Sequence, residues 1–354
     1  MLQNCHGLFL KILLNMIKIC LVGGGNLTHA TLGVLSLSQD LTINLLTRKP
    51  NLWNHTIKVN IPDGKSIYGH LNIITSDPSR VIPEADIILL CLPAFAIEET
   101  IINIKPYLQK DSIVGTIVSN TGFFIYCHKL LSRNTKLFGF QRVPYVSRIV
   151  EYGKETNLLG YRDELFMATE NIDNKEEFKN FIAGAFQEKT TLVESFYEVT
   201  LSNSNPILHT GRLYTMWKDW NGKPFDKCSL FYREWTDEAS ELEVKMDEEF
   251  FKLLKALNVN TSNIETLLTH YESSSPHEMT EKIKSIKSLE TILSPMKQVE
   301  GGWVPDIGSR YFTEDFPYGL SFICNTAKQI NVSVPHLDMV LDWGLNFAEF
   351  CTFN

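Results

Sequence analysis

The sequence predicts an α/β protein: an N-terminal Rossmann-type, doubly wound sheet followed by a mainly α-helical C-terminal domain. An apolar run of strand length, Ile17 to Val22, ends at three glycines and is followed by an apolar pattern of helix length. Farther along, apolar strand-like runs alternate with helical stretches, as they do in doubly wound sheets. From about residue 197, long helical patterns replace this alternation.

The same change of pattern divides the chain into domains. We expect an N-terminal extension over residues 1–15, an NAD(P)-binding Rossmann domain over 16–195, and a helical substrate and catalytic domain over 196–354. A chain of 354 residues is long enough for two domains with separate cores. The apolar stretch inside the extension is interrupted by Lys11 and is too short to span a bilayer. It has no clear small-residue cleavage site, which favours an extension over a cleaved signal.

The glycine triplet after the first strand is typical of a dinucleotide-binding turn. Gly23 would allow the tight turn, and Gly25 would let the backbone approach a pyrophosphate with no Cβ atom in the way. The start of the next helix would offer free N–H groups and the positive end of its dipole to the phosphates. Thr28 replaces the third glycine of the fingerprint, which makes the motif imperfect.

The second strand, predicted over 41–46, is followed by a basic pair where NAD-specific domains often have an acidic residue. That acidic residue would hold the ribose hydroxyls, whereas Arg48 and Lys49 could pair with a 2′-phosphate. A solvated basic turn is the alternative interpretation. The pattern therefore favours NADP(H) as cofactor, with NAD(H) as the second choice.

Further elements complete the predicted first domain. Residues 51–76 have the alternation and turn signals of a short β-rich excursion. The continuous apolar run 85–93 is typical of a strand covered on both faces, and Pro93, which ends it, is assigned to the cofactor site. The remaining expected elements are a helix over 94–104, strands over 112–118 and 139–145, and an amphipathic helix over 175–186.

The second domain is predicted to be built from helices joined by polar connections. Gly301-Gly302 and the serine run before Pro276 have the composition of such connections. Long helical patterns occur over 235–257, 264–271, 278–293 and 318–329.

Composition limits the classes of partner. The net charge of −8 and the pI near 5.7 argue against nucleic acid or an anionic membrane as the main partner. The seven cysteines form no Cys-x-x-Cys pair, which predicts neither a disulfide framework nor a metal site and suits a reducing, cytoplasmic location. We expect small-molecule substrates, and both a monomer and a homodimer stay open.

One stretch of the second domain carries a candidate acid/base residue. In Asn205-Pro206-Ile207-Leu208-His209, Asn205 is a good N-cap and Pro206 suits a first helical turn, so a helix should begin here. Asn205 and His209 would then share one helix face. A histidine on such a face can exchange a proton with a carbonyl or amine during hydride transfer. The alternative is a buried histidine satisfied by backbone groups.

A second stretch, residues 309–319, gathers charged residues between aromatic ones. A partly buried carboxylate such as Asp315 could orient an imidazole, and Arg310 could bind a substrate carboxylate in bidentate fashion. The alternative is a capping cluster at a helix start, with Asp315 shortly before Pro317.

Together these motifs resemble the octopine and opine dehydrogenases. The resemblance pairs Asn-Pro-x-x-His-x-Gly-Arg-Leu-Tyr with Arg-Tyr-Phe-Thr-Glu-Asp-x-Pro-Tyr-Gly, behind a Gly-Gly-Gly-Asn turn, and runs from about Met16 to Phe347. The segment from Val143 to Ile149 is also similar to that family. Two departures are Thr210, where proline is expected, and Leu27-Thr28, where a small pair is usual.

The resemblance implies a reaction and roles. Opine dehydrogenases join an α-keto acid, often pyruvate, to the amino group of an amino acid, and hydride from NAD(P)H reduces the resulting imine. His209 would be the general acid/base and Asp315 its partner, with Asn205 beside the nicotinamide. Arg310, with Arg148 as a second candidate, would bind a substrate carboxylate. Asn26 of the Gly-Gly-Gly-Asn turn joins the cofactor-binding residues.

Two other functions compete with this one. Another two-domain NAD(P)-dependent reductase of 2-keto or 2-hydroxy acids would share the fold, but related reductases usually carry a catalytic lysine, and no lysine stands in a comparable motif. A non-catalytic nucleotide-binding protein would keep the cofactor site without the chemistry. The presence of both His209 and Asp315 favours an enzyme.

Overall fold

The computed structural model describes residues 17–353, which fold into two compact units. The first unit extends to Thr200 and the second begins at Leu201. The extension expected over residues 1–15 lies outside the described residues.

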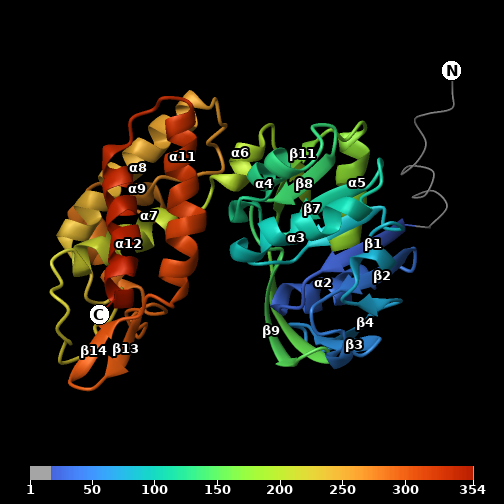
Figure 1. Ribbon diagram of the computed structural model, residues 1–354, viewed down its shortest axis with the longest axis horizontal. Coiled ribbons are helices and arrows are strands. Elements are labelled where there is room, and N and C mark those ends of the chain that lie inside the picture. Colours follow the sequence, from blue (N-terminus) through green and yellow to red (C-terminus); the bar gives the residue numbers. More distant parts are fainter. Residues whose placement is uncertain (1–16, 354) are drawn as a thin grey trace. The chain divides into compact units, whose positions relative to one another are not determined.

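The first unit is built on an eight-stranded sheet with the order β12-β11-β8-β7-β6-β1-β2-β5 (Figure 1). Neighbouring strands are parallel except for β8 and β11, which run antiparallel. The strand bounds are β1 Ile17–Val22, β2 Leu41–Leu46, β5 Ile74–Thr75, β6 Ile87–Leu90, β7 Ile113–Thr116, β8 Lys136–Phe140, β11 Leu165–Glu170 and β12 Thr190–Leu192.

Helices cover both faces of this sheet because successive side chains of each strand point to opposite faces. In β1, Ile19 and Leu21 pack into one core with α2 (Asn26–Leu35) and α5 (Lys175–Phe186). Cys20 and Val22 pack into the other core with α3 (Ile97–Ile104), α4 (Phe123–Leu130) and α6 (Phe196–Thr200). The expected doubly wound α/β fold is thereby confirmed.

A second sheet of four strands packs against α2. Its order is β4-β3-β10-β9, with β3 Thr56–Asn60, β4 Ser66–His70, β9 Tyr145–Glu151 and β10 Glu155–Tyr161. The expected β-rich excursion is part of it. The strand expected over 139–145 is wrong: β8 ends at Phe140 and β9 begins at Tyr145, in a different sheet. Pro144, which has no N–H to donate to a ladder, lies in the turn between them.

Short 3₁₀ turns join several of these elements. The helix expected over 94–104 begins as one of them and continues as α3. Their bounds are η1 Pro50–Leu52, η2 Pro78–Arg80, η3 Ala94–Ala96, η4 Lys105–Tyr107 and η5 Ser119–Thr121.

His29 connects α2 to the turn between β9 and β10. Its Nδ1 donates to Gly25 O (2.8 Å) and its Nε2 accepts from the Gly153 N–H (2.8 Å). The ring lies 4.1 Å from that of Trp53. Burial lowers the pKa of His29, because a desolvated imidazolium is disfavoured. The imidazole is therefore a neutral clamp that needs an unprotonated Nε2.

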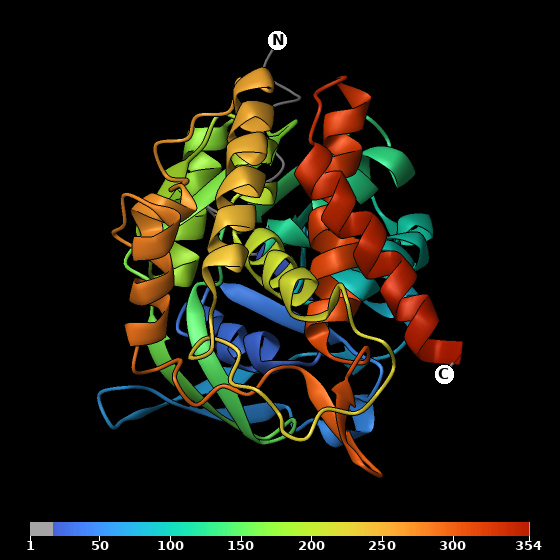
Figure 2. The same ribbon diagram turned by 90° about the vertical axis from the view of Figure 1, so that its left-hand side faces the viewer.

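The second unit surrounds α7 (Asn205–Trp217), which contacts α8 (Asp237–Ala256), η6 (Tyr311–Leu320) and α12 (Pro335–Phe353). Figure 2 shows α7 in yellow-green between the gold α8 and the red C-terminal helices. The remaining elements are α9 Leu267–His270, α10 Pro276–Ser285, β13 Met296–Val299, β14 Gly302–Pro305 and α11 Ser321–Gln329.

Several helix bounds in this unit differ from those expected. α10 ends at Ser285, well before residue 293, because the following segment pairs with the backbone of 229–231: Phe231 N donates to Ile292 O, and Ser294 N to Ser229 O. α9 is only one turn long. The sequence did not predict α12 or the β13–β14 hairpin. Of the expected Gly301-Gly302 connection, Gly301 lies in the turn of this hairpin and Gly302 begins β14.

The helix expected from residue 318 begins earlier, as the π-helical segment η6, and continues into α11. η6 contains Pro317, which has no N–H and is tolerated poorly in a regular α-helix. Wider π-type turns often occur at functional sites. Gly319 packs directly on Pro206 of α7, and a Cβ atom at Gly319 would collide with that proline ring. A glycine is therefore what allows η6 to lie close to α7.

We predict that Gly319→Ala lowers the unfolding free energy of the second unit by about 1–2 kcal/mol, a typical cost of overpacking. Urea unfolding followed by tryptophan fluorescence measures it, because the sequence has five of its six tryptophans in this unit. Gly184→Ala in α5 is the control, since its Cβ would meet open space. Equal stability of Gly319→Ala and wild type would contradict the prediction.

We also predict that the first unit loses stability as the pH falls below about 6.5, the ordinary pKa of histidine. The folded state holds His29 neutral with a lowered pKa, so the unfolded state binds the proton first and is favoured by acid. In His29→Gln this part of the pH dependence should vanish, whereas in His70→Gln, an exposed control, it should remain. Urea titrations at several pH values between 7.5 and 5 give the slope of the unfolding free energy against pH for each variant. The same slope in His29→Gln as in wild type would contradict the proposed role of neutral His29.

Candidate active site

The glycine turn lies where ligands bind in sheets of this type. β1 pairs with β2 on one side and β6 on the other, so the strand order reverses beside β1. Open α/β sheets bind ligands outside the carboxyl ends of strands at such a reversal. Gly23 to Gly25 directly follow the carboxyl end of β1.

Each glycine of the turn has a distinct surrounding. Gly23 has a φ of +134°, and a Cβ atom there would come within 2.6 Å of Cys91 O. A Cβ atom on Gly24 would collide with the Tyr152 hydroxyl. Gly25, the N-cap of α2, has open space where its Cβ would project. Open space beside the first N–H groups of a helix fits a pyrophosphate, so these residues can hold a dinucleotide cofactor.

Asn26 and Thr28 direct their side chains toward the protein. The Asn26 Oδ1 accepts the Ile149 N–H (2.8 Å), which fastens β9 to the start of α2. Thr28 is fully buried, and its hydroxyl faces the Cys91 thiol, whose pKa burial raises to about 12. Asn26 is exposed at the start of α2, so its backbone N–H could contact a cofactor, whereas Thr28 has no exposed surface.

The other site candidates of the first unit are exposed: Arg48, Lys49 and Pro93 for the cofactor, and Arg148 for a substrate carboxylate. Arg48 and Lys49 follow β2, and the Lys49 Nζ lies 5.9 Å from the centre of the Tyr152 ring, next to the glycine turn. Pro93 lies just after β6, the strand beside β1. Arg148 lies on β9 and donates to Ser147 O (2.9 Å); the next residue, Ile149, is the one bound by Asn26.

In the second unit, α7 carries His209. The helix starts at Asn205, but the N-cap is Ser204, which makes no side-chain cap bond, so Asn205 as N-cap is wrong by one residue. Asn205 is an exposed first-turn residue, four positions before His209. Thr210, where the family resemblance led us to expect proline, donates its hydroxyl to Pro206 O (2.5 Å) within an unbroken helix.

The structure brings His209 and Asp315 together across 106 residues of sequence. The His209 Nδ1 lies 2.8 Å from Asp315 Oδ2, and both side chains are mostly buried, 13% and 19% exposed. A carboxylate at this nitrogen fixes the tautomer with the proton on Nδ1 and stabilises a charged imidazole. Nε2 is therefore the nitrogen that can exchange a proton.

Two tyrosines, neither of them predicted as a site residue, lie next to this imidazole. Tyr232 places its hydroxyl 3.1 Å from His209 Nε2, and the Tyr311 ring lies 4.7 Å from the imidazole centre. Tyr311 belongs to a stretch already singled out. Tyr232 lies on an irregular segment before α8, and no spacing in the sequence connects it with His209.

Arg310 is an exposed site candidate of this unit. Its side chain is 83% exposed, and its Nη2 bonds to Glu314 Oε2 at 2.6 Å. This bond raises the pKa of Arg310, which stays charged. Arg310 thus lies on the same π-helical segment as Asp315, and its guanidinium reaches solvent.

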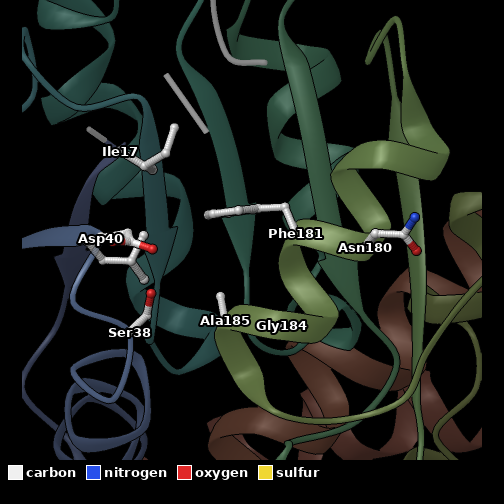
Figure 3. A pocket seen from close by; sticks show the side chains of 8 residues that line it. Ile17, Ser38, Asp40, Asn180, Phe181, Gly184 and Ala185 are labelled. Atoms are coloured by element: carbon white, nitrogen blue, oxygen red, sulfur yellow. The ribbon is translucent and has the colours of Figure 1, made fainter. Parts of the chain in front are cut away.

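Three cavities formed by residues within 17–353 lie away from these site candidates. One of about 280 Å³ lies between α5 and the chain around Ser38 and Asp40, at the amino ends of β1 and β2 (Figure 3). That edge is opposite the glycine turn. A second, of about 380 Å³, borders β9 and β10, and a third, of about 430 Å³, lies beside Arg212 in the second unit.

Among residues 17–353, no group of three or more His, Cys, Asp or Glu side chains could hold a metal ion. Among the same residues, no helix is long and apolar enough to cross a membrane.

Comparison with known proteins relates the chain to a family. Residues 192–347 match the family described as NAD/NADP octopine/nopaline dehydrogenase, alpha-helical domain. The chain is 28% identical to the opine dehydrogenase of Haliotis discus hannai and 26% identical to the octopine dehydrogenase of Mizuhopecten yessoensis; each alignment covers 92% of this chain and 89% of the relative.

A solved octopine dehydrogenase in complex with NADH and L-arginine has the same fold. It superposes with a TM-score of 0.82 at 24% identity, over 94% of this chain and 89% of the other. The family resemblance found in the motifs is confirmed: the helical second unit matches this family's model, and the chain is similar to octopine and opine dehydrogenases over most of its length.

Proposed function

We propose that this protein is an opine dehydrogenase: it condenses an α-keto acid, pyruvate first among them, with the amino group of an amino acid and reduces the imine with NAD(P)H. The observation that carries the proposal is the hydrogen bond between His209 and Asp315 in a chain similar to this family. A keto acid and amine need proton transfer both to form the imine and to accept hydride, and this pair supplies it.

His209 acts as the general acid/base. With Nδ1–H donated to Asp315, the protonated imidazole presents its second proton at Nε2. Loss of water from the first adduct needs a proton on the leaving oxygen, and reduction needs the imine nitrogen protonated. The imidazole can donate a proton to the leaving oxygen and keep the imine nitrogen protonated. Asp315 stabilises the charged ring without taking the proton itself.

The remaining site residues bind and orient. The glycine turn and the first N–H groups of α2 would hold the pyrophosphate of the cofactor, which supplies the hydride when bound. Arg310 would bind a substrate carboxylate through the guanidinium edge that Glu314 leaves free, with Arg148 as a second candidate. Asn205, exposed on the first turn of α7, would orient the reacting groups.

NADP(H) is the cofactor we favour within the NAD(P) class. Arg48 and Lys49 are exposed beside the glycine turn and can pair with a 2′-phosphate. The solved relative is in complex with NADH and therefore does not support NADP(H). The preference for NADP(H) depends on Arg48 and Lys49 alone. A reducing, cytoplasmic location belongs to the same proposal, supported by the unpaired cysteines among residues 17–353.

A spectrophotometric screen tests the reaction. Oxidation of NADPH and NADH is followed with pyruvate and other keto acids, each alone and paired with a panel of amino acids. We expect oxidation that requires both a keto acid and an amino acid. Oxidation with keto acid alone would make the protein a 2-hydroxy acid dehydrogenase. Cofactor binding without oxidation under any pair would make it a non-catalytic nucleotide-binding protein.

We predict that His209→Ala or Asp315→Asn lowers kcat about 10²–10⁴-fold, the range typical of losing general acid/base catalysis. Steady-state kinetics measure the effect, and circular dichroism checks the fold. His270→Ala and Asp342→Asn, at exposed positions of the same unit, are matched controls that should keep wild-type activity. An unchanged kcat in either site variant removes that residue from the mechanism.

We predict that Arg48→Ala combined with Lys49→Ala raises the KM for NADPH about 10–100-fold, the cost of losing hydrogen bonds to a charged phosphate. The KM for NADH should change little, because NADH has no 2′-phosphate. Arg133→Ala, an exposed arginine of the same unit, is the control. An equal rise for both cofactors would mean that the basic pair does not select the phosphate.

A further inference from the structure

We propose that Tyr232 is a positioning residue that acts through His209: its hydroxyl holds the imidazole at Nε2 in both protonation states. The inference rests on the proposed function, because it assigns a task in the proton transfer of that reaction. Neither the motifs nor the family comparison points to Tyr232.

The two nitrogens of His209 have different partners. Nδ1 lies 2.8 Å from Asp315 Oδ2 and Nε2 lies 3.1 Å from the Tyr232 hydroxyl. A carboxylate only accepts, whereas a hydroxyl both donates and accepts. Tyr232 can therefore donate to Nε2 when the imidazole is neutral and accept from Nε2–H when it is charged. The ring does not have to turn between the two states.

The hydroxyl itself stays protonated in this surrounding. Burial raises the pKa of Tyr232, and Tyr311, Tyr271 and Asp315, which face it from neighbouring segments, raise it further. Tyr232 is thus unsuited to be a base and suited to be a neutral hydrogen-bond partner. For proton transfer, the Nε2–H turns its hydrogen bond from the Tyr232 oxygen to a substrate atom beside it; once the proton has left, the Tyr232 O–H rotates and donates to the vacated lone pair. The tyrosine neither gains nor loses a proton.

The Tyr232 ring is fixed by its neighbours. It stacks on Trp235, with ring centres 5.7 Å apart and planes within 3°, and meets Phe231 edge to face at 4.9 Å. Arg212 holds the same segment from α7: its Nη2 donates to Glu234 O (2.6 Å), and its guanidinium lies 5.3 Å from the Trp235 ring centre.

Arg212 and His209 are three residues apart on one helix, so α7 holds both the imidazole and the segment that carries Tyr232. Arg212 is only 4% exposed, and burial lowers its pKa to about 10, which leaves it charged at neutral pH. A buried charged donor that binds backbone carbonyls gives strong, well-oriented bonds. The hydroxyl therefore has a set position before any substrate arrives, which lowers the reorganisation needed during proton transfer.

Tyr232→Phe tests the proposal, because it removes the hydroxyl and keeps the ring on Trp235. We expect kcat to fall about 10- to 100-fold, as for the loss of one buried hydrogen bond, with KM nearly unchanged. The alkaline limb of the pH profile of kcat/KM should move to lower pH, because the charged imidazole loses the stronger of the two bonds. Tyr214→Phe, on α7 with its hydroxyl on Met339, is the matched control and should behave as wild type.

A second readout does not depend on activity. Diethyl pyrocarbonate modifies neutral histidine nitrogens, and mass spectrometry gives the rate at His209 relative to exposed His270. Tyr232 covers Nε2, so modification of His209 should be faster in Tyr232→Phe than in wild type or Tyr214→Phe.

The outcomes separate the two claims. Unchanged kcat, pH profile and modification rate in Tyr232→Phe would overturn the role of Tyr232. A 10- to 100-fold fall in kcat without a shift of the pH profile or a change in the modification rate of His209 would mean that Tyr232 only packs against its neighbours. That result would also overturn the positioning role. If wild type oxidises no cofactor with any substrate pair, the proposed function fails, while the modification rates still test the bond to Nε2.

Discussion

The hydrogen bond between His209 and Asp315 is the interaction on which the chemistry proposed for the second unit depends. It joins two segments far apart in sequence, so it exists only if α7 and η6 pack closely and in one register. Gly319 allows the close approach because, without a Cβ atom, its backbone packs directly on the Pro206 ring. The π-helical turns of η6 accommodate Pro317. Gly319 and Pro317 are not members of the proposed acid/base pair, but their packing allows His209 and Asp315 to come within hydrogen-bond distance.

The cofactor site proposed for the first unit has a different requirement, because backbone groups at the glycine turn must stay free to bind a ligand. Side chains at the glycine turn bind the protein: Asn26 bonds to β9, Thr28 faces Cys91, and His29 spans from Gly25 O to the β9–β10 turn. Because these side chains bind other parts of the protein, the N-terminus of α2 and the open space at Gly25 remain available to phosphates. A neutral His29 makes this arrangement sensitive to acid.

Much of this could be predicted from sequence because the signals were local. The strand, turn and helix around Gly23 and the exact span of α5 follow from periodicity and turn residues over a few positions. The end of α10 could not be predicted, because pairing of the following segment with residues 229–231 overrides helical periodicity. Tyr232 could not be predicted either, because tertiary contacts determine its position. Arg212 and Trp235 hold it beside His209, and no regular spacing in the sequence indicates these contacts.

The most direct measurement follows the hydride into the product. The protein is given pyruvate, an amino acid that supports cofactor oxidation, and NADPH deuterated at either the 4R or the 4S position, and the products are analysed by mass spectrometry. An opine dehydrogenase places deuterium from one of the two labelled cofactors on the pyruvate-derived carbon of a secondary amine. Deuterium found instead in a 2-hydroxy acid, with no labelled secondary amine, would contradict the account.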